Sequence, residues 1–482
     1  MSEAQERMEL DYDTGELEAW DEKIREKVEA FGLTCYDQEF ELCDHTQMLG
    51  AMAYHGMPAH YPHWSYGKSF ERQSTLYNHG VSGLPYEMVI NASPSLAYLM
   101  TKNSLCLQIL TIAHVYAHND FFRNNATFKF TRADSVIPAF KARADRVRGY
   151  IEDPSIGMSR VEPVLDAAHA LSMQCSRNPA IRKLSLEEQK ERAMAAARPP
   201  TDEYHRIHKR PEYVEPDLGR VPLEPDENIL LFIRDYQPRL TEWERDLLTI
   251  VHEEAQYFIP QMETKIMNEG WATYWHREIM NSLELPQGIH LEFLVRHNQV
   301  VQPAVGEINP YHVGLKLWDD IVRRYDHPTD EEIERYGKPS VTGREKMFEL
   351  RETDRDSSFL RRFLTEDLCG ELGLFEFQSQ DGALVVTETP EEGDWKTIRE
   401  TLLRSVGTAS IPVIKVQDAD HRHNGTLLLN HEHDGRDLHL GYAEHSLAHV
   451  FRLWGRPVEL ETLNDGELRR LRYDNAGFHQ AD

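Results

Sequence analysis

Residues 104–122, SLCLQILTIAHVYAHNDFF, decide the fold of this chain. Apolar side chains cover nearly the whole circumference of the helix that their periodicity predicts, so we expect this helix at the centre of a core. Gln108, Thr111, His114 and His118 interrupt the stretch, which therefore falls short of the roughly 18 consecutive apolar residues of a membrane span. It predicts a buried helix of a soluble protein.

His114 and His118 are four residues apart and lie one helical turn from each other on the same face. This HxxxH spacing lets one helix offer two imidazoles to a single metal ion. The glutamate that follows the first histidine in HExxH proteases is absent, because Val115 stands there. The alternative is that both imidazoles simply form hydrogen bonds inside the core.

A second predicted helix, residues 262–283, carries Glu269 and His276 on an apolar face. A carboxylate and an imidazole on such a face are costly unless they are paired or bound to a metal. Gly270 lowers the helix propensity by about 1 kcal/mol, and it would allow another backbone or a ligand to come close. The alternative is a buried ion pair with a structural role.

Three other groups of polar residues give weaker signals. The stretch that begins at His252 resembles HExxH, but Gln256 replaces its second histidine, and at most one inward carboxylate is expected there, Glu254. His60 and His63 flank a proline in an aromatic segment and are expected to stack or to close a loop. Four histidines near the C-terminus are expected to be exposed on a hairpin: His421, His423, His431 and His433. In that hairpin His423 would lie opposite Thr426, so the four are not expected to converge on one ion.

The composition excludes several classes of protein. The 482 residues carry 53 Lys plus Arg and 81 Asp plus Glu, a formal net charge of −28. Such a charge argues against a non-specific nucleic-acid binder and against docking on an anionic membrane. The five cysteines are scattered without a CxxC pair, and residues 1–13 have no apolar core of a signal peptide. We therefore expect a cytoplasmic protein.

Patterning along the chain predicts an α+β fold with two domains. Residues 1–368 are expected to form a mainly α-helical domain, with a proline-rich connecting segment at 179–226 inside it. Residues 369–482 show strand patterns and an Asn-Gly hairpin signal, so they are expected to form a smaller α+β domain.

The motifs of the chain resemble those of the SpoVR family (stage V sporulation protein R) from near its start to its end. The motifs that carry the resemblance are YPHWSYGK at 61–68, YEMVIN at 86–91, AHVYAHNDFFRNN at 113–125, QYF at 256–258, PQ at 260–261, MNEGWATYWH at 267–276 and INPY at 308–311. His118, Glu269 and His276 fall on these motifs. The resemblance implies a cytosolic bacterial protein, linked in spore formers to cortex formation and elsewhere to stress or stationary phase. It also implies two partners, a serine protein kinase and a von Willebrand A-like protein.

Two hypotheses of function stay open. In the first, His114, His118 and Glu269 bind zinc in a zincin-like helical core, which makes the chain a metal-dependent hydrolase of amide or peptide bonds. Glu269 and His276 would then be catalytic, with His276 as an outer partner of the metal ligands or as a proton shuttle, and Glu253 or Glu254 as a base. In the second, the same residues form a buried polar network in a non-enzymatic regulatory or assembly protein. A ferritin-like metal oxidase would need paired ExxH motifs, which the sequence lacks.

Overall fold

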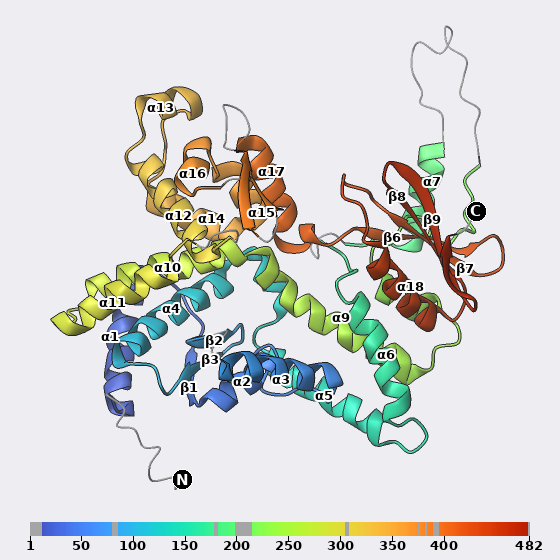
Figure 1. Ribbon diagram of the computed structural model, residues 1–482, viewed down its shortest axis with the longest axis horizontal. Coiled ribbons are helices and arrows are strands. Elements are labelled where there is room, and N and C mark those ends of the chain that lie inside the picture. The colour runs from blue at the N-terminus through green and yellow to red at the C-terminus, as the bar shows by residue number, and fades with distance from the viewer. Residues whose placement is uncertain are drawn as a thin grey trace. The chain divides into compact units, whose positions relative to one another are not determined.

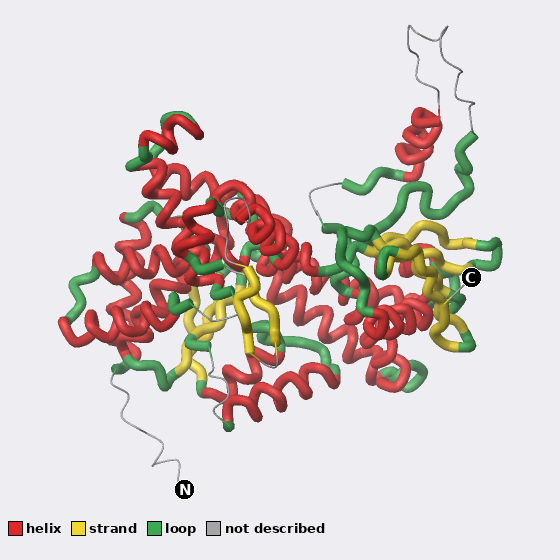
Figure 2. The backbone as a smooth tube through the Cα atoms, turned by 45° about the horizontal axis from the view of Figure 1, so that its top comes forward, coloured by secondary structure: helices red, strands yellow, loops and turns green. Residues whose placement is uncertain are grey.

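The structure is a computed structural model that describes residues 12–79, 85–177, 182–197, 215–303, 308–374, 376–380, 383–388 and 395–480. The chain forms two compact units, each built from two separate stretches of sequence. Unit 1 comprises residues 1–146 and 257–410, and unit 2 comprises residues 147–256 and 411–482. Helices predominate, and the strands form three separate sheets among the described residues (Figure 2), so the fold class is α+β, as the sequence predicts.

Unit 1 holds most of the helices and two of the sheets (Figure 1). Its elements are α1 (Thr14–Ala30), β1 (Gln38–Cys43), α2 (His45–Ala53), α3 (Trp64–Asn78), β2 (Glu87–Ile90), β3 (Ser95–Met100), α4 (Leu105–Asn124), α10 (Lys265–Ser282), α11 (Gln287–Val300), α12 (Pro310–Asp326), α13 (Asp330–Tyr336), α14 (Gly343–Thr353), α15 (Asp356–Phe363), α16 (Glu366–Glu371), β4 (Glu376–Gln380), β5 (Ala383–Glu388) and α17 (Trp395–Ser405). Two short 3₁₀ helices, Ala126–Thr131 and Gly407–Ser410, complete it.

Helix α4 lies at the centre of unit 1, as its apolar circumference predicts. All of its residues from Leu105 to Phe122 are buried. It packs against α10, and the two helices share one core with α1, α12 and α14. A helix that is apolar all round can bury its whole surface only in the middle of a core, which explains this position.

A three-stranded mixed sheet lies beside α4, in the strand order β1-β3-β2. Strand β3 pairs in parallel with β1 and antiparallel with β2. Only four residues separate the end of β3 at Met100 from the start of α4 at Leu105, so the sheet fixes where the N-terminal end of α4 begins. Strand β2 is an edge strand of this sheet.

Unit 2 contains a five-stranded sheet in the order β10-β9-β8-β7-β6. Its elements are α6 (Met158–Leu171), α7 (Leu186–Ala197), α8 (Ile229–Tyr236), β6 (Ile414–His421), β7 (Thr426–His431), α18 (Leu440–Trp454), β8 (Val458–Asn464), β9 (Glu467–Asp474) and β10 (Gly477–Gln480). Helices α5 (Val136–Glu152) and α9 (Glu242–Glu263) contribute residues to both units. No helix among the described residues is both long and apolar enough to cross a membrane.

Each unit combines two separate stretches of sequence, whereas the patterning predicts two contiguous domains, 1–368 and 369–482. Helix α17 belongs to unit 1 because Trp395, Leu402 and Leu403 are buried in the same core as Phe359 of α15. Residues 147–256 group instead with the C-terminal strands, and the backbone of Asp226 pairs with Val416 of β6. Of the proline-rich segment 179–226, residues 179–181 and 198–214 lie outside the described residues.

Local predictions differ in their outcome. The hairpin at Asn424-Gly425 is confirmed as β6–β7. The prolines and glycines of residues 48–83 predict a structured loop rather than a long element. This prediction is wrong, because α2 and α3 occupy most of that stretch. Asp44 explains the start of α2, since its carboxylate accepts hydrogen bonds from the backbone nitrogens of Thr46 and Gln47.

Candidate metal centre

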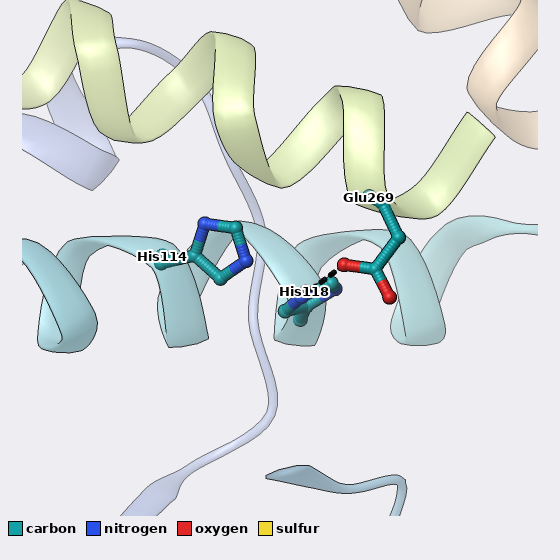
Figure 3. A group of neighbouring side chains, drawn as sticks. All are labelled: His114, His118 and Glu269. Atoms are coloured by element: carbon teal, nitrogen blue, oxygen red, sulfur yellow. Dashed lines mark ion pairs between the residues drawn. The ribbon is translucent and has the colours of Figure 1, made fainter. Parts of the chain in front are cut away.

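Helix α4 presents two imidazoles side by side near its middle. His114 and His118 are 3% and 7% exposed, and their ring centroids lie 4.6 Å apart. The helix begins where Ser104 accepts a hydrogen bond of 3.3 Å from the backbone nitrogen of Leu107. Both rings face α10, as the HxxxH spacing predicts (Figure 3).

Helix α10 supplies the carboxylate of Glu269, which points at the same place (Figure 3). The neighbouring Gly270 lets α12 approach, because a Cβ atom on Gly270 would lie 2.4 Å from the backbone of Gly314. The prediction that this glycine admits another backbone is therefore confirmed. The close crossing of α10 and α12 fixes the backbone position of Glu269, from which its side chain extends.

The first turn of α10 is held by a buried carboxylate from α15. Asp356 accepts hydrogen bonds from the backbone nitrogens of Ile266 and Met267 at 2.8 and 2.9 Å. Burial raises the pKa of Asp356 to about 7, although these bonds act in the opposite direction. This cap fixes the start of the helix less than one turn from Glu269.

The three side chains form a group that could hold a metal ion. One ligand atom from each of His114, His118 and Glu269 lies within 4.8 Å of the other two. The closest of these contacts joins His118 Nε2 to Glu269 Oε2 at 3.5 Å. Ligand atoms around tetrahedral zinc are separated by about 3.3 Å, given zinc–nitrogen bonds of about 2.0–2.1 Å. Small side-chain rotations would bring the three ligand atoms from their present separations to the separation found around zinc.

Among the described residues, two buried atoms of this group have no well-formed hydrogen bond. They are His114 Nε2, which lies 4.0 Å from Glu87 Oε1, and Glu269 Oε2, which forms an ion pair with His118 Nε2 at 3.5 Å if His118 is protonated. A buried polar atom without a partner costs on the order of 1–3 kcal/mol, so such atoms call for an explanation. A metal ion bound by both atoms would supply one, and the residues present therefore fit such an ion.

The opposite ring nitrogens of the two histidines are both engaged in hydrogen bonds. His118 Nδ1 lies 2.9 Å from Oδ1 of Asn268, which can only accept. His114 Nδ1 lies 2.8 Å from Nδ1 of His276, whose Nε2 lies 2.8 Å from Nδ1 of His297 on α11. All contacts are satisfied when His114 and His118 carry their proton on Nδ1. Both Nε2 lone pairs then face the ligand group, the arrangement that outer hydrogen bonds impose on metal-binding histidines.

The electrostatics of the row His114–His276–His297 favour neutral rings. Burial holds the pKa of His114 and of His276 well below the usual range, and nearby imidazoles add to the effect. Burial also lowers the pKa of His297 to about 4, helped by the charge of Arg277. Neutral imidazole is the form that binds metal ions.

His118 behaves differently because it faces a carboxylate. Burial acts to lower its pKa, but the hydrogen-bonding and charge effects of Glu269, with the bond to Asn268, outweigh burial and raise it. When no ion is bound, the Glu269 carboxylate therefore favours the protonated form of His118. A metal ion would compete with this proton for the same nitrogen.

Two further residues at the site were missed by the sequence analysis. Glu87 of β2 places Oε1 4.0 Å from His114 Nε2, and burial raises its pKa to about 7. The negative charge of Glu269, followed by burial, raises the pKa of the Tyr311 hydroxyl, so this group keeps its proton. A charged residue in the otherwise apolar strand 87–90 was the available signal for Glu87.

The remaining predicted residues lie elsewhere. His276 is fully buried behind His114 and is not one of the three grouped ligands. His252, Glu253 and Glu254 fall in unit 2 and do not belong to the group either. The inward carboxylate predicted at Glu254 is confirmed, since this residue is buried.

The two minor histidine groups have ordinary partners. His60 stacks on Tyr54, with ring centroids 5.8 Å apart and an interplanar angle of 29°, as expected for this aromatic segment. The expectation that the C-terminal histidines are exposed is wrong for His431, which is buried and bonds to Thr462 Oγ1 at 2.9 Å. His421, rather than His423, pairs with Thr426, because the hairpin turn takes up residues 422–425.

Comparisons with known proteins agree on one family. Residues 11–411 match the model described as "SpoVR like protein", and residues 412–465 match the "SpoVR-like C-terminal domain". The "Uncharacterized protein YcgB" of Escherichia coli (strain K12) is 34% identical over 484 residues, an alignment that covers 94% of this chain and 93% of that protein. No solved structure gives a significant match. The chain belongs to the SpoVR family.

Proposed function

We propose that this protein is a metal-dependent hydrolase of amide or peptide bonds, with zinc held by His114, His118 and Glu269. The observation that carries the proposal is the grouping of three buried ligand atoms within 4.8 Å of one another, in which His114 Nε2 has no hydrogen-bond partner among the described residues. Zinc with three protein ligands keeps an open position, at which it lowers the pKa of a bound water towards neutrality.

The side chains around the ligands suit proton transfer and charge stabilisation. Glu87 is placed to accept a proton from a water at the site and to return it to the leaving nitrogen, the work of a general base and acid. The protonated hydroxyl of Tyr311 is hydrogen-bonded to Glu269. Once Glu269 holds the ion, this hydroxyl could turn to donate to the carbonyl oxygen, which gains negative charge in the transition state. The side chains of Glu87 and Glu269 are 18% and 19% exposed, so a substrate would approach from the carboxylate side.

His276 and His297 act in this proposal as positioning residues. They lie behind His114 and hold its Nδ1 proton, which leaves Nε2 for the metal. Of the two roles predicted for His276, we propose the outer partner rather than the proton shuttle, because its ring nitrogens contact His114 Nδ1 and His297 Nδ1 and neither faces the proposed metal position.

The test is an assay of a labelled unfolded protein, such as fluorescent casein, with zinc-loaded enzyme. Glu87→Gln should keep its zinc and lose activity by roughly 10²- to 10⁴-fold, since it removes only the base. Glu269→Gln should lose zinc and activity together. Zinc-loaded protein that cleaves no peptide or amide bond would contradict the hydrolase assignment.

The alternative is a non-enzymatic regulatory or assembly protein. One observation favours it: the row His114–His276–His297 joins α4, α10 and α11 by hydrogen bonds, as a purely structural network would. A serine protein kinase and a von Willebrand A-like protein are the proposed partners. Protein that folds fully and binds no metal would favour this alternative.

The proposed setting is the bacterial cytoplasm. The family resemblance supports roles in spore cortex formation in spore formers and in stress or stationary-phase physiology elsewhere. A hydrolase in that compartment would act on cell-wall precursors or on proteins rather than on the finished wall.

A further inference from the structure

Strand β2 forms the edge of the mixed sheet at the point where the sheet meets the ligand group. It pairs with β3 on one side, with Glu87 opposite Leu99 and Val89 opposite Ala97. Its Glu87 side chain reaches to 4.0 Å from His114 Nε2. The face of β2 that carries the Glu87 side chain therefore lies towards the candidate metal centre.

The main-chain groups of Glu87 and Val89 point away from β3. Tyr86 accepts a hydrogen bond from the backbone nitrogen of Met100 at 3.4 Å, which marks Tyr86 and Met100 as a bonded pair. Bonded and non-bonded pairs alternate along an antiparallel ladder. Glu87 and Val89 thus belong to non-bonded pairs, and among the described residues nothing donates to or accepts from their main chain on the outer side.

We propose that an extended peptide binds along β2 as a fourth strand of this sheet, through the main chain of Glu87 and Val89. This inference rests on the proposed function and names its substrate class: an unfolded polypeptide segment, recognised by its backbone. An unpaired edge is a template for such pairing, and an added strand lies about 4.7–4.9 Å from its neighbour. A peptide in that strand would be the direct neighbour of the strand whose Glu87 side chain reaches the ligand group.

The occupant is a peptide rather than a second copy of this chain. The net charge of −28 opposes self-association at an edge that already carries Glu87. The strand is also only four residues long, which offers two outward residues, enough to align a flexible peptide and too few to join two folded sheets.

The test uses a mixture of random hexapeptides that carry a dye and have capped ends. Fluorescence anisotropy measures how tightly this mixture binds to the full-length, zinc-loaded protein. Val89→Pro removes one outward N–H and leaves the β3 ladder intact. It should weaken binding roughly five- to tenfold, the effect of about one hydrogen bond. The matched control Val89→Ala keeps the N–H and should bind within about twofold of the wild type.

Two further measurements keep the inference open to refutation if Val89→Pro folds poorly. Methylating every second amide nitrogen of the peptide mixture should weaken binding to the wild-type protein by roughly tenfold or more. The peptide should also slow hydrogen exchange at the amides of Glu87 and Val89. Equal binding of the two peptide mixtures, or unchanged exchange at these amides, would overturn the inference.

These outcomes are separable from failure of the proposed function. Protein that binds zinc and cleaves a short acyl-amide, yet ignores methylation of the peptide, refutes the docking edge alone. Protein that binds no zinc refutes the metal site, and the peptide measurements then decide the docking edge on their own.

Discussion

His114 shows how a single buried residue carries the chemical argument. Its Nδ1 is engaged by His276, and its Nε2 lies buried beside two carboxylates without a hydrogen bond. A histidine with a purely structural role would be expected to satisfy both nitrogens. The orientation of this one ring therefore supports the proposal that His114 is a metal ligand.

Replacing His276 by phenylalanine should weaken zinc binding without removing a ligand. The change takes away the acceptor of the His114 Nδ1 proton, and loss of such outer partners typically costs 10- to 100-fold in metal affinity. Competition with a chromophoric zinc chelator measures the dissociation constant. His327→Ala, an exposed histidine of the same unit, is the control and should leave the affinity unchanged. Equal affinity in both variants would refute the positioning role.

His252 should make unit 2 sensitive to acid. Burial, with the charge of Arg234, lowers the pKa of His252 to about 4 in the folded protein, while the unfolded value is about 6.5. Between these values the unfolded state binds the extra proton, so stability present above pH 6.5 is lost as the pH falls towards 4. The loss at pH 5 is roughly 1–2 kcal/mol.

Thermal unfolding of the wild type and of His252→Gln at pH 8 and pH 5 tests this expectation. The variant should lose less stability than the wild type on going from pH 8 to pH 5. An identical loss in both proteins would show that His252 does not titrate as described.

The sequence reveals these residues unevenly, for a physical reason. His114, His118 and Glu269 could be predicted because helical spacing alone puts polar groups on an apolar face. Glu87 could not, since its place beside His114 depends on how a strand packs on a helix. The outer partner His297 also depends on packing, and nothing in its local sequence marks it.

At the scale of elements, the crossing of α10 and α12 controls where Glu269 lies. Gly270 and Gly314 touch backbone to backbone, a contact that no other residue type permits. The glycine signal in the sequence indicated such an approach, but it could not indicate which element approaches. Elements whose start depends on a capping side chain within a glycine- and proline-rich stretch, such as α2 and α3, were also missed.

Gly270→Ala should destabilise unit 1 and disturb the metal site together. The added Cβ would lie 2.4 Å from Gly314 backbone atoms, so α10 and α12 must separate, at a cost of about 2–3 kcal/mol or more. Urea denaturation and zinc titration measure the two effects. Gly288→Ala on α11 meets nothing within 4 Å and should instead stabilise by up to about 1 kcal/mol. Similar behaviour of the two variants would refute the close crossing as the cause.

At the scale of the whole molecule, the chain passes three times between its two units, at 146/147, 256/257 and 410/411. Unit 1 uses residues 1–146 and 257–410, and unit 2 uses the intervening stretch and the C-terminus. Sequence patterning predicts elements in order and so favours contiguous domains. A division in which distant stretches fold together depends on tertiary packing, which is why a boundary at 368/369 does not describe these units.

Zinc should stabilise unit 1 selectively, because all three proposed ligands belong to it. Hydrogen exchange of the apoprotein and the zinc-loaded protein measures this. Slower exchange is expected in α4 and α10, where the ion would tie two helices together. The sheet of unit 2 should exchange at the same rate in both states. Equal protection in both units, or none in α4, would contradict the assignment of the site.

The central claim is that His114, His118 and Glu269 hold one metal ion, and metal analysis tests it most directly. Protein purified without a histidine tag and equilibrated with zinc should contain about one equivalent after gel filtration, and His118→Ala and Glu269→Gln should each lose it while remaining folded. Wild-type protein without bound zinc, or variants that keep the full equivalent, would contradict the claim.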